Sequence, residues 1–186
     1  GIFRSWDEVY NHAYINQATT GDTDANGNPI YDADARNETT ALTQTAPGDI
    51  KWRDVNGDGV INNDDQVALG SPIPDFIYGM TFNASYNNFD FQLFLQGSHG
   101  NEIYNAAKRW LVDFRQNFNQ GVEALNSTPY QENYTASEAR IVRADPNRNV
   151  LRSSDRYVSS GSYARIKNLV VGYSFPQAVL DKINAQ

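Results

Sequence analysis

Residues 76–96 read FIYGMTFNASYNNFDFQLFLQ, and the alternation within them decides the predicted fold. Apolar and aromatic residues occupy every second position on both sides of the pair Asn87-Asn88. Successive side chains of a β-strand point to opposite faces, so the pattern predicts two strands that each have one apolar face. Asparagine tolerates positive φ, which suits a two-residue turn and predicts an antiparallel hairpin. The apolar series is Phe76, Tyr78, Met80, Phe82, Ala84 and Tyr86, followed by Phe89, Phe91, Leu93 and Leu95.

Two environments fit this hairpin. Each arm has roughly ten residues, the length that a tilted strand needs to cross the hydrocarbon core of a bilayer. Tyr86 and Phe89 flank the turn and further aromatic residues begin the first arm, as in the interfacial girdles of outer-membrane barrels. A soluble β-sandwich explains the pattern equally well, with the apolar face packed on a second sheet. Residues 162–176 alternate in the same way and predict a third strand.

The composition limits the classes of function. The chain has 186 residues and a net charge of −7, which argues against nucleic-acid partners because these require a basic stripe. It contains no cysteine, which excludes disulfides and zinc sites built on sulfur. Its longest apolar runs are a few residues, too short for a membrane-spanning helix. A transmembrane barrel stays open, because alternating strands give only a weak hydropathy signal.

A second informative stretch, residues 54–65, reads DVNGDGVINNDD and has the spacing of an EF-hand-type calcium loop. Such loops present oxygen ligands at positions 1, 3, 5, 7, 9 and 12 and need glycine at position 6, which is Gly59 here. Ile61 at position 8 is expected to anchor the loop to a neighbouring core. The alternative is a surface turn rich in Asn, Asp and Gly that has no metal-binding role. The predicted Ca²⁺ ligands are Asp54, Asn56, Asp58, the carbonyl of Val60, Asn62 and Asp65.

Residues 22–33 imitate the front half of such a loop, but Ile30 and Ala33 occupy positions where ligands are required. This stretch is therefore interpreted as an Asn-Gly turn.

Residues 97–160 form a long polar segment with a predicted helix around 104–114. We interpret its arginines as dispersed, solvated charges. They are Arg140, Arg143, Arg148, Arg152 and Arg156.

Catalytic chemistry has no support in the sequence. The histidines His12 and His99 lack any motif that would join them to a serine and an aspartate, so we predict no catalytic residue and no enzyme activity. The tryptophans and several tyrosines could stack on sugar rings, although core packing is the simpler expectation for most of them.

The order of several segments resembles one family. Residues 48–105, GDIKWRDVNGDGVINNDDQVALGSPIPDFIYGMTFNASYNNFDFQLFLQGSHGNEIYN, are followed by residues 154–176, SDRYVSSGSYARIKNLVVGYSFP. Together they closely resemble the C-terminal barrel region of SusC/RagA-type TonB-dependent outer-membrane transporters. The resemblance implies a mostly β fold made of antiparallel strands from a transmembrane β-barrel, with long loops and short helices. It places 54–65 and 97–160 outside the cell, and Asn87-Asn88 and Pro176 at periplasmic turns.

The same resemblance implies an importer of glycans or peptides. It would work in the outer-membrane lipid with a SusD-type lipoprotein as lid and with TonB as the periplasmic partner. The plug domain and TonB box of the family have no match here, so we expect residues 1–186 to be a partial C-terminal barrel region whose fold can differ in isolation. The alternative is a soluble cell-surface module that binds carbohydrate or protein in a calcium-dependent way.

Overall fold

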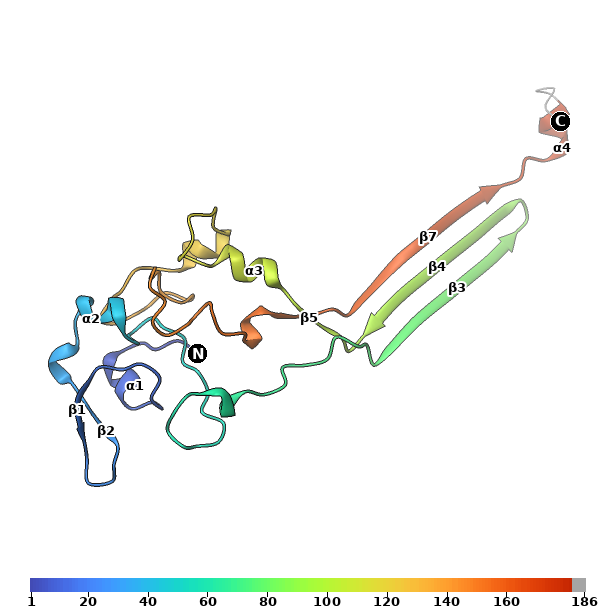
Figure 1. Ribbon diagram of the computed structural model, residues 1–186. Helices are drawn as coiled ribbons and strands as arrows, with labels where there is room; N and C mark the ends of the chain where they lie inside the picture. The colour runs from blue at the N-terminus through green and yellow to red at the C-terminus, as the bar shows by residue number, and fades with distance from the viewer. Residues whose placement is uncertain (182–186) are drawn as a thin grey trace. The chain divides into compact units, whose positions relative to one another are not determined.

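The computed structural model describes residues 1–181 and is mixed, mostly antiparallel β with short helices (Figure 1). It divides into two compact units. Unit 1 comprises Gly1–Ala68 and Asn105–Tyr157, and unit 2 comprises Leu69–Tyr104 and the described residues from Val158 onward. Residues 182–186 of the predicted barrel region lie outside the described residues. Over the described range, no helix has the length and apolar character to cross a membrane.

Unit 2 is built on a three-stranded antiparallel sheet in the order β3-β4-β7, which is open at both edges over the described residues (Figure 1). Asn87 has a φ of 52° in the turn between β3 and β4, so the predicted hairpin and its turn chemistry are confirmed. The second arm is longer than predicted, because it pairs with β3 as far as His99. The strands are β3 (Phe76–Tyr86), β4 (Phe89–His99) and β7 (Tyr163–Tyr173).

The pairing of β4 with β7 contains one irregularity. Phe94 pairs with Asn168 and Leu95 pairs with Ile166, so the register passes over Lys167. The extra residue shifts the alternation of β7 by one position. This shift places Ile166 on the same face as Leu95. Two short strands and a helix complete the unit, β5 (Glu102–Tyr104), β6 (Val158–Ser160) and α4 (Gln177–Leu180).

Unit 1 contains short elements joined by long loops. Ser5 caps α1, because its side chain accepts the N–H of Glu8 at 3.3 Å. A small apolar cluster comprises Phe3, Trp6, Val9, Tyr10, Ala41 and Ala46. The helices and strands are α1 (Trp6–Tyr10), β1 (Thr19–Thr23), β2 (Pro29–Tyr31), η1 (Ala33–Ala35), α2 (Glu38–Thr43), η2 (Asn63–Asp65), α3 (Ala106–Leu111), η3 (Val122–Asn126) and η4 (Asp155–Tyr157).

Candidate functional site

The first half of the loop 54–65 is held by a single carboxylate. Asp54 accepts the N–H of Gly57 at 2.7 Å and the N–H of Gly59 at 3.0 Å, one with each oxygen. Both glycines have positive φ, 77° and 81°, a conformation that costs glycine little and other residues more. The sequence DVNGDG therefore folds into a tight coil around its first aspartate.

The following predicted ligands also bond to the backbone within the loop. Asn56 accepts the N–H of Asp58 at 3.0 Å, and Asp58 accepts the N–H of Val60 at 2.8 Å. Asn62 and Asp65 form a reciprocal capping box around the short helix η2. These turns leave further acceptor capacity on the carboxylate and amide oxygens, since each oxygen has two lone pairs.

An isolated β-bridge to Tyr14 anchors the loop. Tyr14 donates its N–H to the carbonyl of Gly59 at 2.7 Å, and its own carbonyl accepts the N–H of Ile61 at 2.8 Å. Ile61 is buried, which confirms the predicted anchor at position 8. Arg152 adds a weak bond from its guanidinium to the carbonyl of Ile61 at 3.4 Å. The middle of the loop, from Gly59 to Ile61, can therefore move less than an unsupported surface turn.

The donors of the loop are oxygen atoms, which suit a hard cation. Backbone N–H groups of Asn62 and Val55 hold the pKa of Asp65 below its usual range, which keeps this carboxylate charged. Among residues 1–181, no group of three or more acidic, histidine or cysteine side chains is close enough to hold a metal ion. The structure thus places all six predicted ligands in one anchored loop, and the calcium site stays a prediction.

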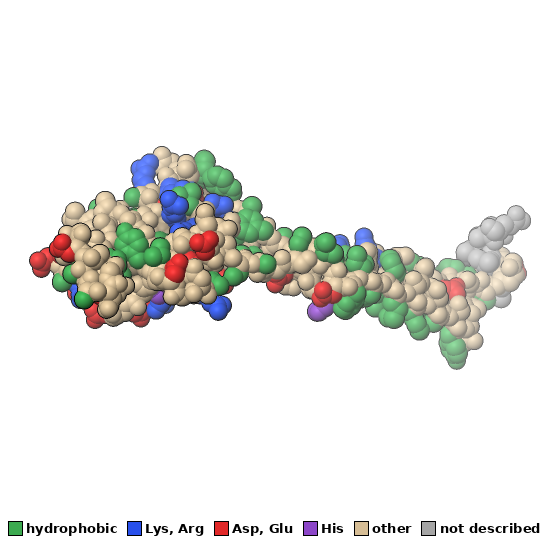
Figure 2. Space-filling view, turned by 60° about the horizontal axis from the view of Figure 1, so that its bottom comes forward, with side chains coloured by type: hydrophobic (Ala, Val, Ile, Leu, Met, Phe, Trp, Pro, Cys, Tyr) green, Lys and Arg blue, Asp and Glu red, His purple; other side chains and the backbone are tan. Residues whose placement is uncertain are grey.

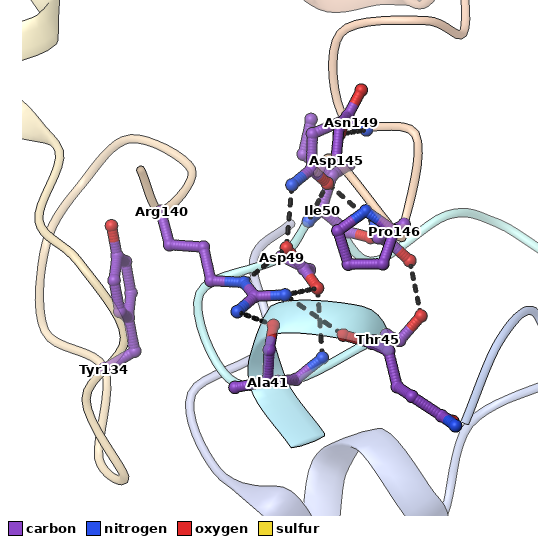
Figure 3. A network of polar contacts seen from close by, with 12 residues as sticks. Ala41, Thr45, Asp49, Ile50, Tyr134, Arg140, Asp145, Pro146 and Asn149 are labelled. Atoms are coloured by element: carbon purple, nitrogen blue, oxygen red, sulfur yellow. Dashed lines mark hydrogen bonds and ion pairs between the residues drawn. The ribbon is translucent and has the colours of Figure 1, made fainter. Parts of the chain in front are cut away.

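Unit 1 also contains a buried polar network that the sequence reasoning missed (Figure 3). Arg140 and Asp49 form a bidentate ion pair with distances of 2.7 and 2.8 Å, and both side chains are almost completely inaccessible. Asn149 donates to the same carboxylate at 2.7 Å, and the N–H of Ala46 does so at 3.0 Å. The network therefore joins the segment around residue 49 to the far end of the long loop.

Further contacts complete this network. The guanidinium of Arg140 donates to the carbonyls of Ala41 and Gln44, so its charge is surrounded by acceptors (Figure 3). Burial raises the pKa of Asp145, while N–H groups of Val150 and Asn149 oppose that shift. The interpretation of Arg140 as a solvated charge is wrong, because its side chain is buried against Asp49. Asp49 lies 91 positions away in the sequence, so no local pattern indicates the pair.

The sheet of unit 2 has two chemically different faces. In one row across the sheet, Phe82 pairs with Leu93, which pairs with Leu169. In the next row, Asn83 pairs with Gln92 on the opposite face. Figure 2 shows hydrophobic side chains gathered along these strands. The exposed apolar side chains on this face include Phe76, Tyr78, Met80, Phe82, Tyr86, Phe89, Ile166, Leu169, Val171 and Tyr173.

Aromatic rings occupy both ends of this apolar face. At the turn end, the rings of Phe89 and Tyr173 lie 4.7 Å apart, and Phe175 lies 5.2 Å from Tyr173. At the other end, Phe76 lies 6.0 Å from Tyr78. The middle of the face is mostly aliphatic. This distribution matches the one that the sequence predicted for strands with interfacial girdles.

Comparisons with known proteins agree with this architecture. No family model matches the chain. The TonB-dependent receptor P26 of Formosa agariphila is 38% identical over 135 residues, which are 69% of this chain and 13% of that receptor. The TonB-dependent receptor SusC of Bacteroides thetaiotaomicron is 31% identical over 123 residues, 66% of this chain and 11% of SusC. The chain therefore spans a small part of the relatives that it matches.

A solved structure adds evidence on the fold alone. In the RagAB peptide importer in the "closed-closed" state, one chain matches with a TM-score of 0.50 and 15% identity, over 89% of this chain and 15% of that chain. The homologues are TonB-dependent receptors, a class of outer-membrane proteins, and not enzymes. The chain is thus homologous to a short region of SusC/RagA-type TonB-dependent receptors.

Proposed function

We propose that the chain is part of the C-terminal barrel region of a TonB-dependent outer-membrane importer. One observation carries the proposal, namely the open sheet with a continuous apolar face and an opposite face of mostly polar or small residues. Its strands have 11 residues each, which suffices for a tilted strand to cross the hydrocarbon core. The homologous receptors support the same assignment.

In this proposal the apolar face meets lipid, and the polar face borders the lumen. Neighbouring strands outside these residues would satisfy the open edges of β3 and β7, since unpaired backbone groups are costly in hydrocarbon. The loop 54–65 and the segment 97–160 would lie on the extracellular side, with the segment 97–160 available to substrate or to a lid. We assign glycans or peptides as substrate, a SusD-type lipoprotein as lid and TonB as the energy-coupling partner.

Two serine-to-cysteine variants test this topology. The 186 residues contain no cysteine, and both Ser137 in unit 1 and Ser174 beyond β7 are exposed. Each variant is made in the full-length protein, with any cysteine elsewhere replaced, and intact cells receive a thiol reagent that cannot cross the outer membrane. Ser137→Cys should react in intact cells, whereas Ser174→Cys should react only after the membrane is permeabilised.

Each variant serves as the control for the other, so differences in expression level or in reagent reactivity do not affect the conclusion. Labelling of both sites in intact cells would contradict the proposed topology. So would labelling of Ser174→Cys alone, because it would invert the orientation. Recovery of the protein in the soluble fraction, with both sites reactive there, would instead support the cell-surface binding module.

We also propose that the loop 54–65 binds Ca²⁺ on the extracellular side. The bound ion would supply positive charge that draws the loop carboxylates together. Support comes from the six oxygen donors at the required spacing and from the two glycines at positive φ. Tyr14 and Ile61 already hold part of the loop, so ion binding would remove the remaining loop entropy before a ligand or lid arrives.

Calorimetric titration of the purified full-length protein in detergent tests this second proposal. Asp54→Ala and Asp58→Ala each remove one carboxylate and should abolish most of the heat of calcium binding. Asp24→Ala is the matched control, since Asp24 lies in the exposed Asp/Asn/Gly turn that lacks the later ligands. An unchanged heat in Asp54→Ala, or an equal loss in Asp24→Ala, would contradict a site in this loop.

A further inference from the structure

The chain contains two Asn-Gly pairs, Asn26-Gly27 and Asn56-Gly57. In such a pair, the backbone nitrogen of glycine can attack the side-chain carbonyl carbon of asparagine, because glycine has no side chain to block the approach. The reaction depends on how freely the asparagine side chain can reorient. The two pairs differ strongly in this respect.

Asn26 is free at the tip of the hairpin β1–β2. Its side chain is exposed and forms no hydrogen bond to any of residues 1–181. The N–H of Gly27 donates to the backbone carbonyl of Asp24 at 3.0 Å, an ordinary turn bond. No heavy atom lies within 4 Å of the position where a side chain on Gly27 would begin. Exposed turns at hairpin tips open at little cost in free energy.

Asn56 is held inside the loop 54–65. Its amide nitrogen donates to the carboxylate of Asp58 at 2.9 Å, and its amide oxygen accepts the N–H of Asp58 at 3.0 Å. The N–H of Gly57 donates to the carboxylate of Asp54 at 2.7 Å, a charge-assisted bond. The attack of Gly57 nitrogen on Asn56 therefore requires several bonds to break first.

We propose that Asn26 is a site of spontaneous deamidation and that Asn56 is protected from it. The nitrogen of Gly27 loses its proton to a water base and bonds to the side-chain carbonyl carbon of Asn26. The bond from that carbon to the amide nitrogen breaks, and ammonia leaves with a proton from water. Water then opens the cyclic imide at one of its two carbonyls and yields aspartate or isoaspartate.

The product changes the turn in two ways. It adds a negative charge close to Asp24, whose carboxylate accepts the N–H groups of Asn26 and Asn28 at 2.8 and 2.9 Å. Isoaspartate also lengthens the backbone by one carbon, which disturbs the pairing of Thr23 with Pro29. Deamidation would therefore loosen the hairpin β1–β2 and leave the loop 54–65 intact.

The experiment follows both sites in one sample. The full-length protein in detergent is incubated at mildly alkaline pH with a calcium chelator, and digested samples are analysed by mass spectrometry and by isoaspartate-specific methylation. Asn26 should convert about tenfold faster than Asn56, because releasing the Asn56 amide costs on the order of 1.4 kcal/mol in hydrogen bonds. In denaturant the two rates should become similar.

Two variants sharpen the result. Asp58→Ala removes the acceptor of the Asn56 amide and should raise the Asn56 rate without changing the rate at Asn26. Gly27→Ala places a side chain beside the attacking nitrogen and should slow conversion at Asn26. Equal rates at both sites in the folded protein would overturn the proposal. So would a stable Asn26 under conditions in which the denatured chain reacts.

Discussion

Unit 1 buries charged and polar side chains, whereas the sheet of unit 2 exposes apolar ones. Asp49 is 0% exposed and Arg140 is 2% exposed, while Phe82 and Val171 are 53% and 66% exposed. Globular proteins usually show the reverse, and exposed apolar side chains in a continuous patch mark a surface that another partner covers. Unit 1 thus pairs its buried charges internally, while the apolar face of unit 2 is exposed within its own unit.

The polar interior of unit 1 is best tested at Asp49. Asp49→Ala leaves the guanidinium of Arg140 buried without a counter-charge, and loss of one partner of a buried pair costs about 3–5 kcal/mol. Hydrogen exchange of unit 1 amides in the full-length protein should show this loss as faster opening. Asp7→Ala is the control, because the ion pair of Asp7 with Arg36 is largely exposed and is worth at most about 1 kcal/mol. Equal effects of the two variants would contradict an internally organised unit 1.

The exposed face of unit 2 is best tested at neighbouring positions on opposite faces. Phe82→Arg places a charge on the apolar face, which costs about 2–4 kcal/mol if that face meets the middle of a bilayer. Thr81→Arg places the same charge on the polar face and should cost far less. The measurement is the amount of folded protein in the outer membrane, read from heat-modifiable migration in gels. Similar losses in both variants would remove the distinction between the faces.

A smaller effect is expected from the packing between strands. A Cβ on Gly97 would lie 2.3 Å from the hydroxyl of Tyr78 and 2.4 Å from the carbonyl of Tyr163, so Gly97→Ala should cost about 1–3 kcal/mol. Gly79→Ala is the matched control, since its Cβ would meet only ordinary contacts at 3.5 Å and beyond. Thermal unfolding in detergent compares the two. A similar decrease of the unfolding temperature in both variants would show that the packing of the Tyr78 ring does not require glycine at position 97.

The features that sequence could predict are those with a local signal. The hairpin followed from strict alternation and from Asn87-Asn88, and the third strand from the same pattern in residues 162–176. The buried Ile61 also followed from a short motif, as position 8 of the loop 54–65. The predicted helix around 104–114 is shorter, at Ala106–Leu111.

The features that sequence could not predict depend on distant partners. Arg140 belongs to a set of spaced arginines, and nothing near it indicates that Asp49 is its partner. The docking of Tyr14 against the loop 54–65 likewise has no periodic signature, because a single bridge residue leaves no pattern. Whether the six loop donors assemble around calcium stays a prediction, since the spacing fixes the order of the ligands and not their convergence.

The smallest expected effect again concerns unit 1 and comes from pH. Hydrogen bonds from Arg115 lower the pKa of Asp113, whose side chain is 2% exposed and lies 2.7 Å from the guanidinium. A lowered pKa stabilises the fold above the unfolded value of about 3.9, and this contribution disappears as the pH falls below that value. The loss should be about 1 kcal/mol, because Arg115 is partly exposed. Hydrogen exchange of the amides of Asp113, Arg115 and Gly121 at decreasing pH measures it. Asp113→Asn should remove this part of the pH dependence, and a variant that keeps it unchanged would assign the acid sensitivity to another carboxylate.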